Sequence, residues 1–504
     1  MSRHATLLAA IGLLLVHFLI RSQSITQLEP YVDEGTHMTR AAVVWNFDAH
    51  PARFSHGKLL VYFWLGLFDG PPSTNLAAGR LAIALFSTIT GAALFLLGRW
   101  LWNPYTGLLA LGIYALLPYA FFFERMALAD PFAAGFAVLV AWRSLAFARH
   151  PTLREGFAVG LLLALASMAK LTMALLPLLT VTAVLWVGLQ RGDLRRGFLR
   201  SLPGLCVAAL VVILMWLPIL IPAYVSQQTD HPFILVNEFN IQRDDAFAPT
   251  GPLDYLVSVL PLIAEFTSPI FLIGAGMALV MNGLRRQSRG LTLFVLVWLL
   301  IVALPVILLA RVVTARYLMT LAAPLTLALA AGLDQFRRLP IPTSRQMRQA
   351  AGIGVVTAWM VTFAVPFAQA TPRDLPFSGN NVFDFQSGFL TADDRVREAA
   401  QVLSEIQPAG IVYATKEACH MLSFYSDNFT LRCLDDDPVP TFGQTLRHDL
   451  ASGQAAYLVI SWYYGPFHLG IDWLQSEEIP LHTPPRFQGP GYEFRLWRIH
   501  MKQI

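Results

Sequence analysis

The chain has 504 residues, of which 55% are hydrophobic and only 13% are charged, and its formal net charge is +4 at pH 7. Soluble globular proteins carry about 25% charged residues, so the composition excludes a wholly soluble protein. The positive charge lies in Arg clusters between apolar blocks, which a membrane explains without any nucleic acid as partner. Residues 1–370 are therefore expected to form a transmembrane domain, and residues 371–504, with an ordinary soluble composition, a second domain.

About eleven apolar segments are long enough, or nearly so, to cross the membrane as helices, which takes about 20 residues each. They are residues 5–20, 79–98, 107–123, 131–147, 156–169, 172–189, 198–221, 268–283, 291–310, 317–334 and 350–369. The apolar stretch 57–69 is instead expected to lie as a short helix at the outer interface, because its aromatic residues suit the level of the headgroups. The sequence predicts a polytopic α-helical membrane protein.

The Arg-rich loops predict the orientation, because short cytoplasmic loops carry an excess of Lys and Arg. Such loops occur at residues 143–154, 191–200, 285–289 and 337–348. This pattern places the N-terminus in the cytoplasm and leaves loops 21–78 and 222–267 outside, together with the C-terminal domain. The membrane would be the inner or plasma membrane of the cell.

Charged residues beside hydrocarbon are costly and call for an explanation. The predicted outer loops collect such residues together with other polar groups: Asp33, Glu34, His56, Lys58, Arg125, Asp130, Lys170, Glu238, Arg243, Arg316 and Tyr317. A carboxylate can take the proton of an attacking hydroxyl, and fixed cations can bind a phosphate and stabilise its charge as it departs. The set therefore suits displacement of a lipid phosphate from a sugar by an acceptor hydroxyl.

Single members of this set have simpler explanations. Adjacent acids in a loop are usually solvated, and Arg125 and Asp130 could pair with each other or with headgroups. Lys170 could be an anchor whose ammonium reaches the membrane surface. The collection on one predicted side of the membrane carries the functional hypothesis.

Five short motifs occur in order among these residues: 31–35 (Tyr-Val-Asp-Glu-Gly), 56–59, 125–132, 237–243 and Arg316-Tyr317. They resemble motifs of the polytopic GT-C glycosyltransferases that include protein O-mannosyltransferases and the lipid A aminoarabinose transferase (glycosyltransferase family 39/83-like). Phe239 stands where many members have His, which puts any role for that histidine in doubt. The resemblance covers most of the membrane region and is strongest over residues 30–145.

The resemblance implies an inverting glycosyl transfer from a polyprenyl-phosphate sugar, with no nucleotide cofactor. Asp33 is then the general base, with Glu34 as its substitute or orienting neighbour. Lys58, Arg125, Arg243 and Arg316 would bind the donor phosphate, supported by Asp130, His56, Glu238, Tyr317 and Lys170. Some members are reported to bind a divalent metal near the acidic motif, and no metal site is assigned here. The sugar and the acceptor, whether protein, lipid or glycan, are not implied.

The C-terminal domain alternates expected helices with expected strands. Helices are predicted at 392–406, 416–425 and 441–452, and strands at 411–414, 429–434, 456–461 and 493–499. This order indicates a small α/β domain with a mainly parallel sheet. Cys419 and Cys433 both fall in it, so a disulfide is possible there if the domain lies outside the cytoplasm.

Two other classes of protein compete with a transferase. A membrane transporter also has many helices and intramembrane charge, but its binding sites lie at mid-membrane between related halves. No convincing internal repeat occurs, and the charges lie at the level of the loops. A non-catalytic envelope assembly protein is the second alternative. A test of polyprenyl-phosphate sugars as substrates distinguishes the three classes.

Overall fold

A computed structural model describes residues 2–55, 57–226, 252–285, 288–309, 315–338, 345–369, 395–406, 410–433, 446–452, 456–461, 474–482 and 494–501. The chain forms two compact units. The first comprises Met1–Gln23, Val44–Trp64 and Leu81–Asn380, and the second Ser24–Val43, Leu65–Arg80 and Asn381–Ile504. The second unit thus contains parts of the first predicted outer loop together with the C-terminal region.

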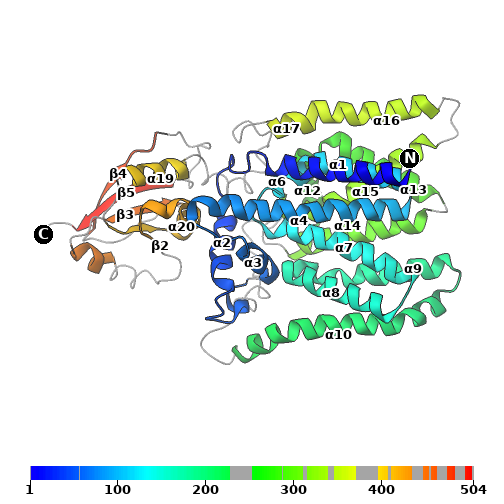
Figure 1. Ribbon diagram of the computed structural model, residues 1–504, viewed down its shortest axis with the longest axis horizontal. Helices are drawn as coiled ribbons and strands as arrows, with labels where there is room; N and C mark the ends of the chain where they lie inside the picture. The colour runs from blue at the N-terminus through cyan, green and yellow to red at the C-terminus, as the bar shows by residue number, and fades with distance from the viewer. Residues whose placement is uncertain are drawn as a thin grey trace. The chain divides into compact units, whose positions relative to one another are not determined.

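The first unit is built from apolar helices, the longest of which run alongside one another (Figure 1). They are α1 (Arg3–Ser22), α4 (Pro72–Leu101), α5 (Pro104–Leu116), α6 (Pro118–Phe123), α7 (Ala129–Arg149), α8 (Leu153–Ala169), η2 (Leu171–Leu175), α9 (Pro177–Gln190), α10 (Leu194–Ser226), α12 (Pro252–Thr267), α13 (Pro269–Leu284), α14 (Arg289–Leu309), η4 (Arg316–Leu321), α15 (Ala322–Arg337), α16 (Arg345–Trp359), η5 (Met360–Ala364) and α17 (Val365–Gln369). The first residues of α4 belong to the second unit. Each predicted span coincides with one of these helices or with consecutive ones, so the helical integral membrane domain is confirmed.

The number of spans is smaller by length and composition alone. Within the described parts of the chain, seven helices are long and apolar enough to cross a membrane, or eight if Leu260–Thr267 and α13 form one span. That pair bends by 106° at Ser268, whose φ is +75° and which precedes Pro269. The shorter apolar helices α5 and Arg289–Leu304 account for two further predicted spans.

Pro118 divides the segment predicted as a single span at 107–123. Helix α5 ends at Leu116, Leu117 has an extended ψ of 115°, and Pro118 begins α6. This follows from proline chemistry, because the ring removes a backbone donor and pushes the preceding residue out of the helical region. The break places Glu124 at the end of a short buried helix.

Small residues bring α8 and α10 into close contact. A Cβ atom added at Gly160 of α8 would lie 2.6 Å from the Ala208 carbonyl oxygen of α10, and one at Gly156 would overlap the backbone of Gly204. Spacings of four residues between small side chains allow helices in a membrane to approach at backbone distance. The contact therefore depends on the absence of side chains at these positions.

We expect Gly160→Leu to lower the thermal stability of the purified protein, because a side chain at this position must push the two helices apart. Overpacking of a close contact costs roughly 1–3 kcal/mol. Gly276→Leu in α13 is the matched control, since a Cβ there meets nothing within 4 Å. Equal melting temperatures for the two variants would contradict this account of the α8–α10 contact.

The second unit contains a mixed five-stranded sheet in the order β2-β1-β3-β5-β4. Its strands are β1 (Val412–Ala414), β2 (Leu431–Cys433), β3 (Ala456–Ser461), β4 (Leu474–Ile479) and β5 (Phe494–Met501). Pairs β1–β2 and β1–β3 are parallel, whereas β3–β5 and β4–β5 are antiparallel. The expectation of a mainly parallel sheet was therefore wrong for strands β3, β5 and β4. Strand β4 was not predicted, because it is polar and largely exposed and so has no apolar pattern.

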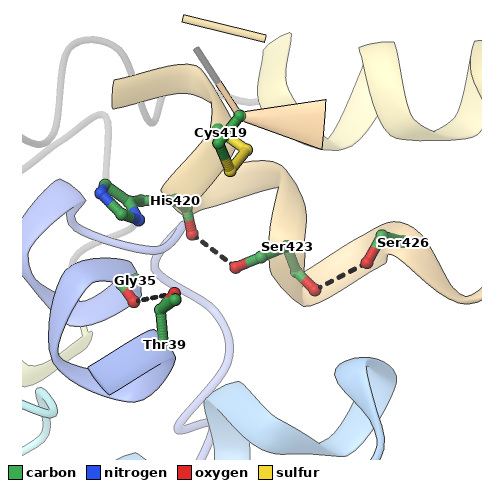
Figure 2. Close-up of a disulfide and its surroundings, with 7 residues drawn as sticks. Gly35, Thr39, Cys419, His420, Ser423 and Ser426 are labelled. Carbon is green, nitrogen blue, oxygen red and sulfur yellow. Dashed lines mark hydrogen bonds between the residues drawn. A yellow bond between two sulfur atoms is a disulfide. The ribbon is translucent and has the colours of Figure 1, made fainter. Parts of the chain in front are cut away.

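Helix α2 (Val32–Val44), which carries the acidic motif, packs on the C-terminal part of the second unit. Figure 2 shows Gly35 of α2 beside His420 of α20 (Lys416–Leu422). A Cβ at Gly35 would overlap the backbone carbonyl group of His420, so only glycine permits this approach. The acidic motif is thus positioned by residues almost 400 places further along the chain.

Cys419 and Cys433 form a disulfide that joins α20 to β2, with their Cα atoms 5.4 Å apart. The disulfide that the sequence indicated as possible is therefore present. Cys419 is fully buried in the apolar core of this unit, beside Val396, Leu403 and Val412. The disulfide fixes the helix on which α2 rests.

Replacing both cysteines, Cys419→Ala with Cys433→Ala, is expected to lower the free energy of unfolding of the second unit by about 3 kcal/mol, the value for a loop of about 15 residues. The sequence separation of the pair is 14. Urea-dependent proteolysis under non-reducing conditions would measure the loss. Cys206→Ser, at an exposed free cysteine on α10, should leave the proteolysis profile unchanged. Identical profiles for the double variant and this control would refute the stabilising role.

Candidate active site

The first unit gathers charged side chains from distant parts of the chain around Asp130. Asp130 lies in the first turn of α7, and Lys170 follows the last residue of α8 in an extended conformation (φ −158°, ψ 128°). Arg316 is the first residue of η4. We call Lys58, Asp130, Lys170, Arg316 and Tyr317 the Asp130 cluster.

The contacts within the Asp130 cluster are direct. The Lys170 ammonium donates a hydrogen bond to Asp130 Oδ1, and Arg316 Nε lies 3.7 Å from Asp130 Oδ2. Lys58, just before α3 (Leu59–Gly66), interacts electrostatically with the same carboxylate. The side chains of Asp130 and Arg316 are 7% and 8% exposed, so these charges are largely withdrawn from water.

Tyr317 contacts two of these cations, those of Lys170 and Arg316. Lys170 Nζ lies 4.4 Å from the ring centroid, and Arg316 Cζ lies 4.9 Å from it. Arg316 Nη2 also donates to the Tyr317 hydroxyl at 3.2 Å. Cations over an aromatic face are attracted by its quadrupole, so the tyrosine orients both side chains without neutralising them.

The Asp130 cluster contains three positive side chains and one carboxylate. Because their charges repel one another and are costly to desolvate, an anionic ligand would stabilise the arrangement. Fixed ammonium and guanidinium groups suit a phosphate, which accepts several charge-assisted hydrogen bonds. The same groups would stabilise charge that develops on a departing phosphate.

The acidic motif belongs to the second unit, where Glu34 has a structural partner. Arg80 donates to its carboxylate from Nε at 2.8 Å and from Nη2 at 2.6 Å. Glu34 Oε2 also accepts from the Tyr31 backbone N–H at 2.8 Å, which is the contact of a Glu at the third helical position with the N-cap residue. Both carboxylate oxygens thus serve to fix the start of α2.

Asp33 occupies the preceding position in the first turn of α2 and is half-buried. Successive residues lie about 100° apart around an α-helix, so its carboxylate faces a different direction from that of Glu34. The bidentate ion pair of Glu34 therefore anchors the helix turn on which Asp33 stands.

Of the remaining predicted site residues, Arg125 lies between α6 and α7 and donates from Nη2 to the Gln23 carbonyl oxygen at 2.9 Å. His56, Glu238 and Arg243 lie outside the residues that the structure describes. In the described ranges, no group of three or more His, Cys, Asp or Glu side chains is placed to hold a metal ion.

Two buried ion pairs were not predicted from the sequence. Arg21, at the end of α1, donates from Nε to Glu124 Oε2 at 2.5 Å, and the Tyr114 hydroxyl donates to Glu124 Oε1 at 2.7 Å. The other pair is Arg80 with Glu34. An arginine at the end or inside an apolar run is the signal that could have indicated both pairs, because an arginine buried there needs a partner.

Comparisons with known proteins place the fold. The family model for dolichyl-phosphate-mannose-protein mannosyltransferase matches residues 60–221. A comparison of the sequence with curated proteins finds no match.

Solved structures of two glycosyltransferases resemble the chain over most of its length. ArnT from Cupriavidus metallidurans bound to undecaprenyl phosphate is 16% identical, with 92% of this chain and 94% of that chain covered and a TM-score of 0.54. The apo state of the same protein is 15% identical, with 99% and 98% covered and a TM-score of 0.55. The oligosaccharyltransferase AglB from Archaeoglobus fulgidus, in complex with an inhibitory peptide and a dolichol-phosphate, is 10% identical, with 91% and 69% covered and a TM-score of 0.57.

These matches show that the chain has the fold of ArnT and AglB, and that part of its membrane domain is similar to the protein mannosyltransferase family.

Proposed function

We propose that the protein transfers a sugar from a polyprenyl-phosphate donor to an acceptor hydroxyl or phosphate on the outer face of the membrane. The observation that carries this proposal is the Asp130 cluster, with its three cations beside one carboxylate in a largely buried setting. The lipid phosphates bound by ArnT and AglB support a lipid phosphate as the ligand.

In the proposed reaction, the acceptor oxygen attacks the anomeric carbon of the sugar while the bond from that carbon to the phosphate oxygen breaks. The bonding electrons pass to the phosphate, and the acceptor proton passes to Asp33 as general base. Attack from the face opposite the phosphate inverts the configuration. Lys58 and Arg316 bind the departing phosphate, while Asp130 and Tyr317 keep the cations in place; His56, Arg125, Glu238 and Arg243 remain predictions for the same site.

Three observations support the proposed orientation. Asp130, Lys170 and Arg316, all assigned to outer loops, meet in one cluster. Arg191 donates to the Arg149 carbonyl oxygen at 2.9 Å, so two loops assigned to the cytoplasm also meet. The Cys419–Cys433 disulfide fits an oxidising compartment, which favours an extracytoplasmic second unit.

The test is to incubate the purified protein with a panel of polyprenyl-phosphate sugars and an extract of cell-envelope acceptors, and to follow the products by mass spectrometry. A transferase releases the free polyprenyl phosphate and adds one sugar mass to an acceptor. A transporter or an assembly protein would leave every donor intact. Full recovery of all donors, from protein that binds them, would overturn the proposal.

A further inference from the structure

The second unit contains a cavity of about 530 Å³. Four segments line it: residues 24–27 before the acidic motif, the start of α4, helix α19 (Arg395–Ile406) and helix η8 (Ser423–Asn428). Its lining includes Thr26, Gln27, Ser73, Arg397, Phe424 and Tyr425. The volume lies within the range of ordinary ligand sites, about 300–1,000 Å³.

The wall of the cavity is held by a buried carboxylate. The Glu29 carboxylate forms an ion pair with Arg397 Nη2 at 2.5 Å and accepts a hydrogen bond from the Tyr425 hydroxyl at 2.7 Å. Arg397 Nη2 also donates to the Thr26 carbonyl oxygen at 3.3 Å. At the start of α4, the Ser73 backbone N–H donates to Asp427 Oδ2 at 3.1 Å. These contacts fix the lining before any ligand arrives, which lowers the cost of binding.

The lining is polar and locally balanced in charge. Arg397 is its one charged residue among those the structure describes, and Glu29 pairs with it. Burial raises the pKa of Tyr425, and the nearby Glu29 carboxylate raises it further, so the phenol stays protonated and donates. Hydroxyl and amide groups beside aromatic rings favour a ligand with many hydroxyl groups and a partly apolar face, and they favour neither an anion nor a cation.

We propose that this cavity binds a neutral sugar chain of the acceptor. The proposal rests on the transferase function above and assigns the acceptor its chemical class, a hydroxyl-rich glycan portion. The aromatic rings of Phe424 and Tyr425 would contact the apolar face of a sugar ring, while Gln27 and Ser73 would exchange hydrogen bonds with its hydroxyls.

Saturation-transfer NMR on the full-length protein tests this proposal, in a detergent without a sugar headgroup. The probes are maltotetraose and mannotriose, with a neutral hexapeptide as the competing class of ligand. Ser73→Trp and, independently, Gln27→Trp fill the cavity from exposed positions. Thr74→Trp is the matched control, because Thr74 is exposed next to Ser73 and is not among the lining residues.

We expect a probe sugar to bind the wild type and Thr74→Trp, and about tenfold or more weaker binding, a loss of at least about 1.4 kcal/mol, in both filling variants. Absence of sugar binding to the wild type, equal binding by all variants, or binding of the peptide alone would overturn the proposal. Release of polyprenyl phosphate from the donor, measured in the same preparations, reports separately on the transferase function. Sugar binding without donor turnover would therefore contradict the proposed function and leave the cavity as a saccharide site.

Discussion

Replacing Asp33 by Asn should lower the rate of sugar transfer by about 10²–10⁴-fold, the usual contribution of a general base. Asparagine keeps the size and polarity of the side chain and removes its ability to take the acceptor proton. Helix α2 should remain in place, because this variant keeps the Glu34–Arg80 ion pair and the close fit of Gly35 against His420. Initial rates of product formation at saturating donor, with thermal melts of the same samples, measure both expectations.

Glu34→Gln is the informative companion to this variant. It leaves the buried guanidinium of Arg80 without its charged partner, and breaking a buried ion pair costs roughly 3–5 kcal/mol. We therefore expect a lower melting temperature from Glu34→Gln than from Asp33→Asn. A folded Asp33→Asn protein that transfers sugar at the normal rate would refute the assignment of the base.

The second large effect is expected at the Asp130 cluster. Arg316→Met should lower kcat/KM by about 10²–10³-fold, the loss found when one preorganised group that stabilises a developing oxyanion is removed. The methionine retains most of the packing volume and removes the charge and the hydrogen-bond donors. Lys170→Met should act in the same direction, because Lys170 shares Asp130 and Tyr317 with Arg316.

The matched control removes a positive charge elsewhere in the first unit. Arg196, whose side chain is 80% exposed, pairs with Asp193 three residues before it on the α10 side of a predicted cytoplasmic loop. Arg196→Met should leave kcat/KM for the donor unchanged. Equal losses for Arg196→Met and Arg316→Met would indicate a general effect of charge and would argue against a phosphate site at the Asp130 cluster.

The membrane helices could be predicted from the sequence, because an apolar segment that crosses a membrane satisfies its backbone hydrogen bonds by forming a helix. The meeting of Lys58, Asp130, Lys170 and Arg316 was also expected, although only from their common predicted side of the membrane. The partners of each charge were not predictable. Arg80 belongs to an apolar run, and nothing in its neighbourhood indicates that it binds Glu34 across 46 positions of sequence.

The division of the chain into two units could not be predicted from the order of its residues. A change of composition at residue 371 marks where apolar blocks end, but it carries no information about which earlier segment packs on the second unit. Helix α2 belongs to that unit because Gly35 fits against α20 and Glu29 binds Arg397 and Tyr425. These are single long-range contacts, which leave no periodic pattern in the sequence. Strand β4 lacks an apolar pattern for a different reason, because it is polar and largely exposed.

The most direct test of the central claim, that the Asp130 cluster binds a lipid phosphate, is photocrosslinking. A polyprenyl phosphate with a photoreactive first isoprene unit is bound to the purified protein, and the labelled peptides are mapped by mass spectrometry. We expect labels next to Asp130, Lys170 and Arg316, with loss of labelling in Arg316→Met. Labelling instead around Asp334, which pairs with Arg337 and Arg338 near the other end of α15, roughly 30 Å along the helix from Arg316, would contradict the claim.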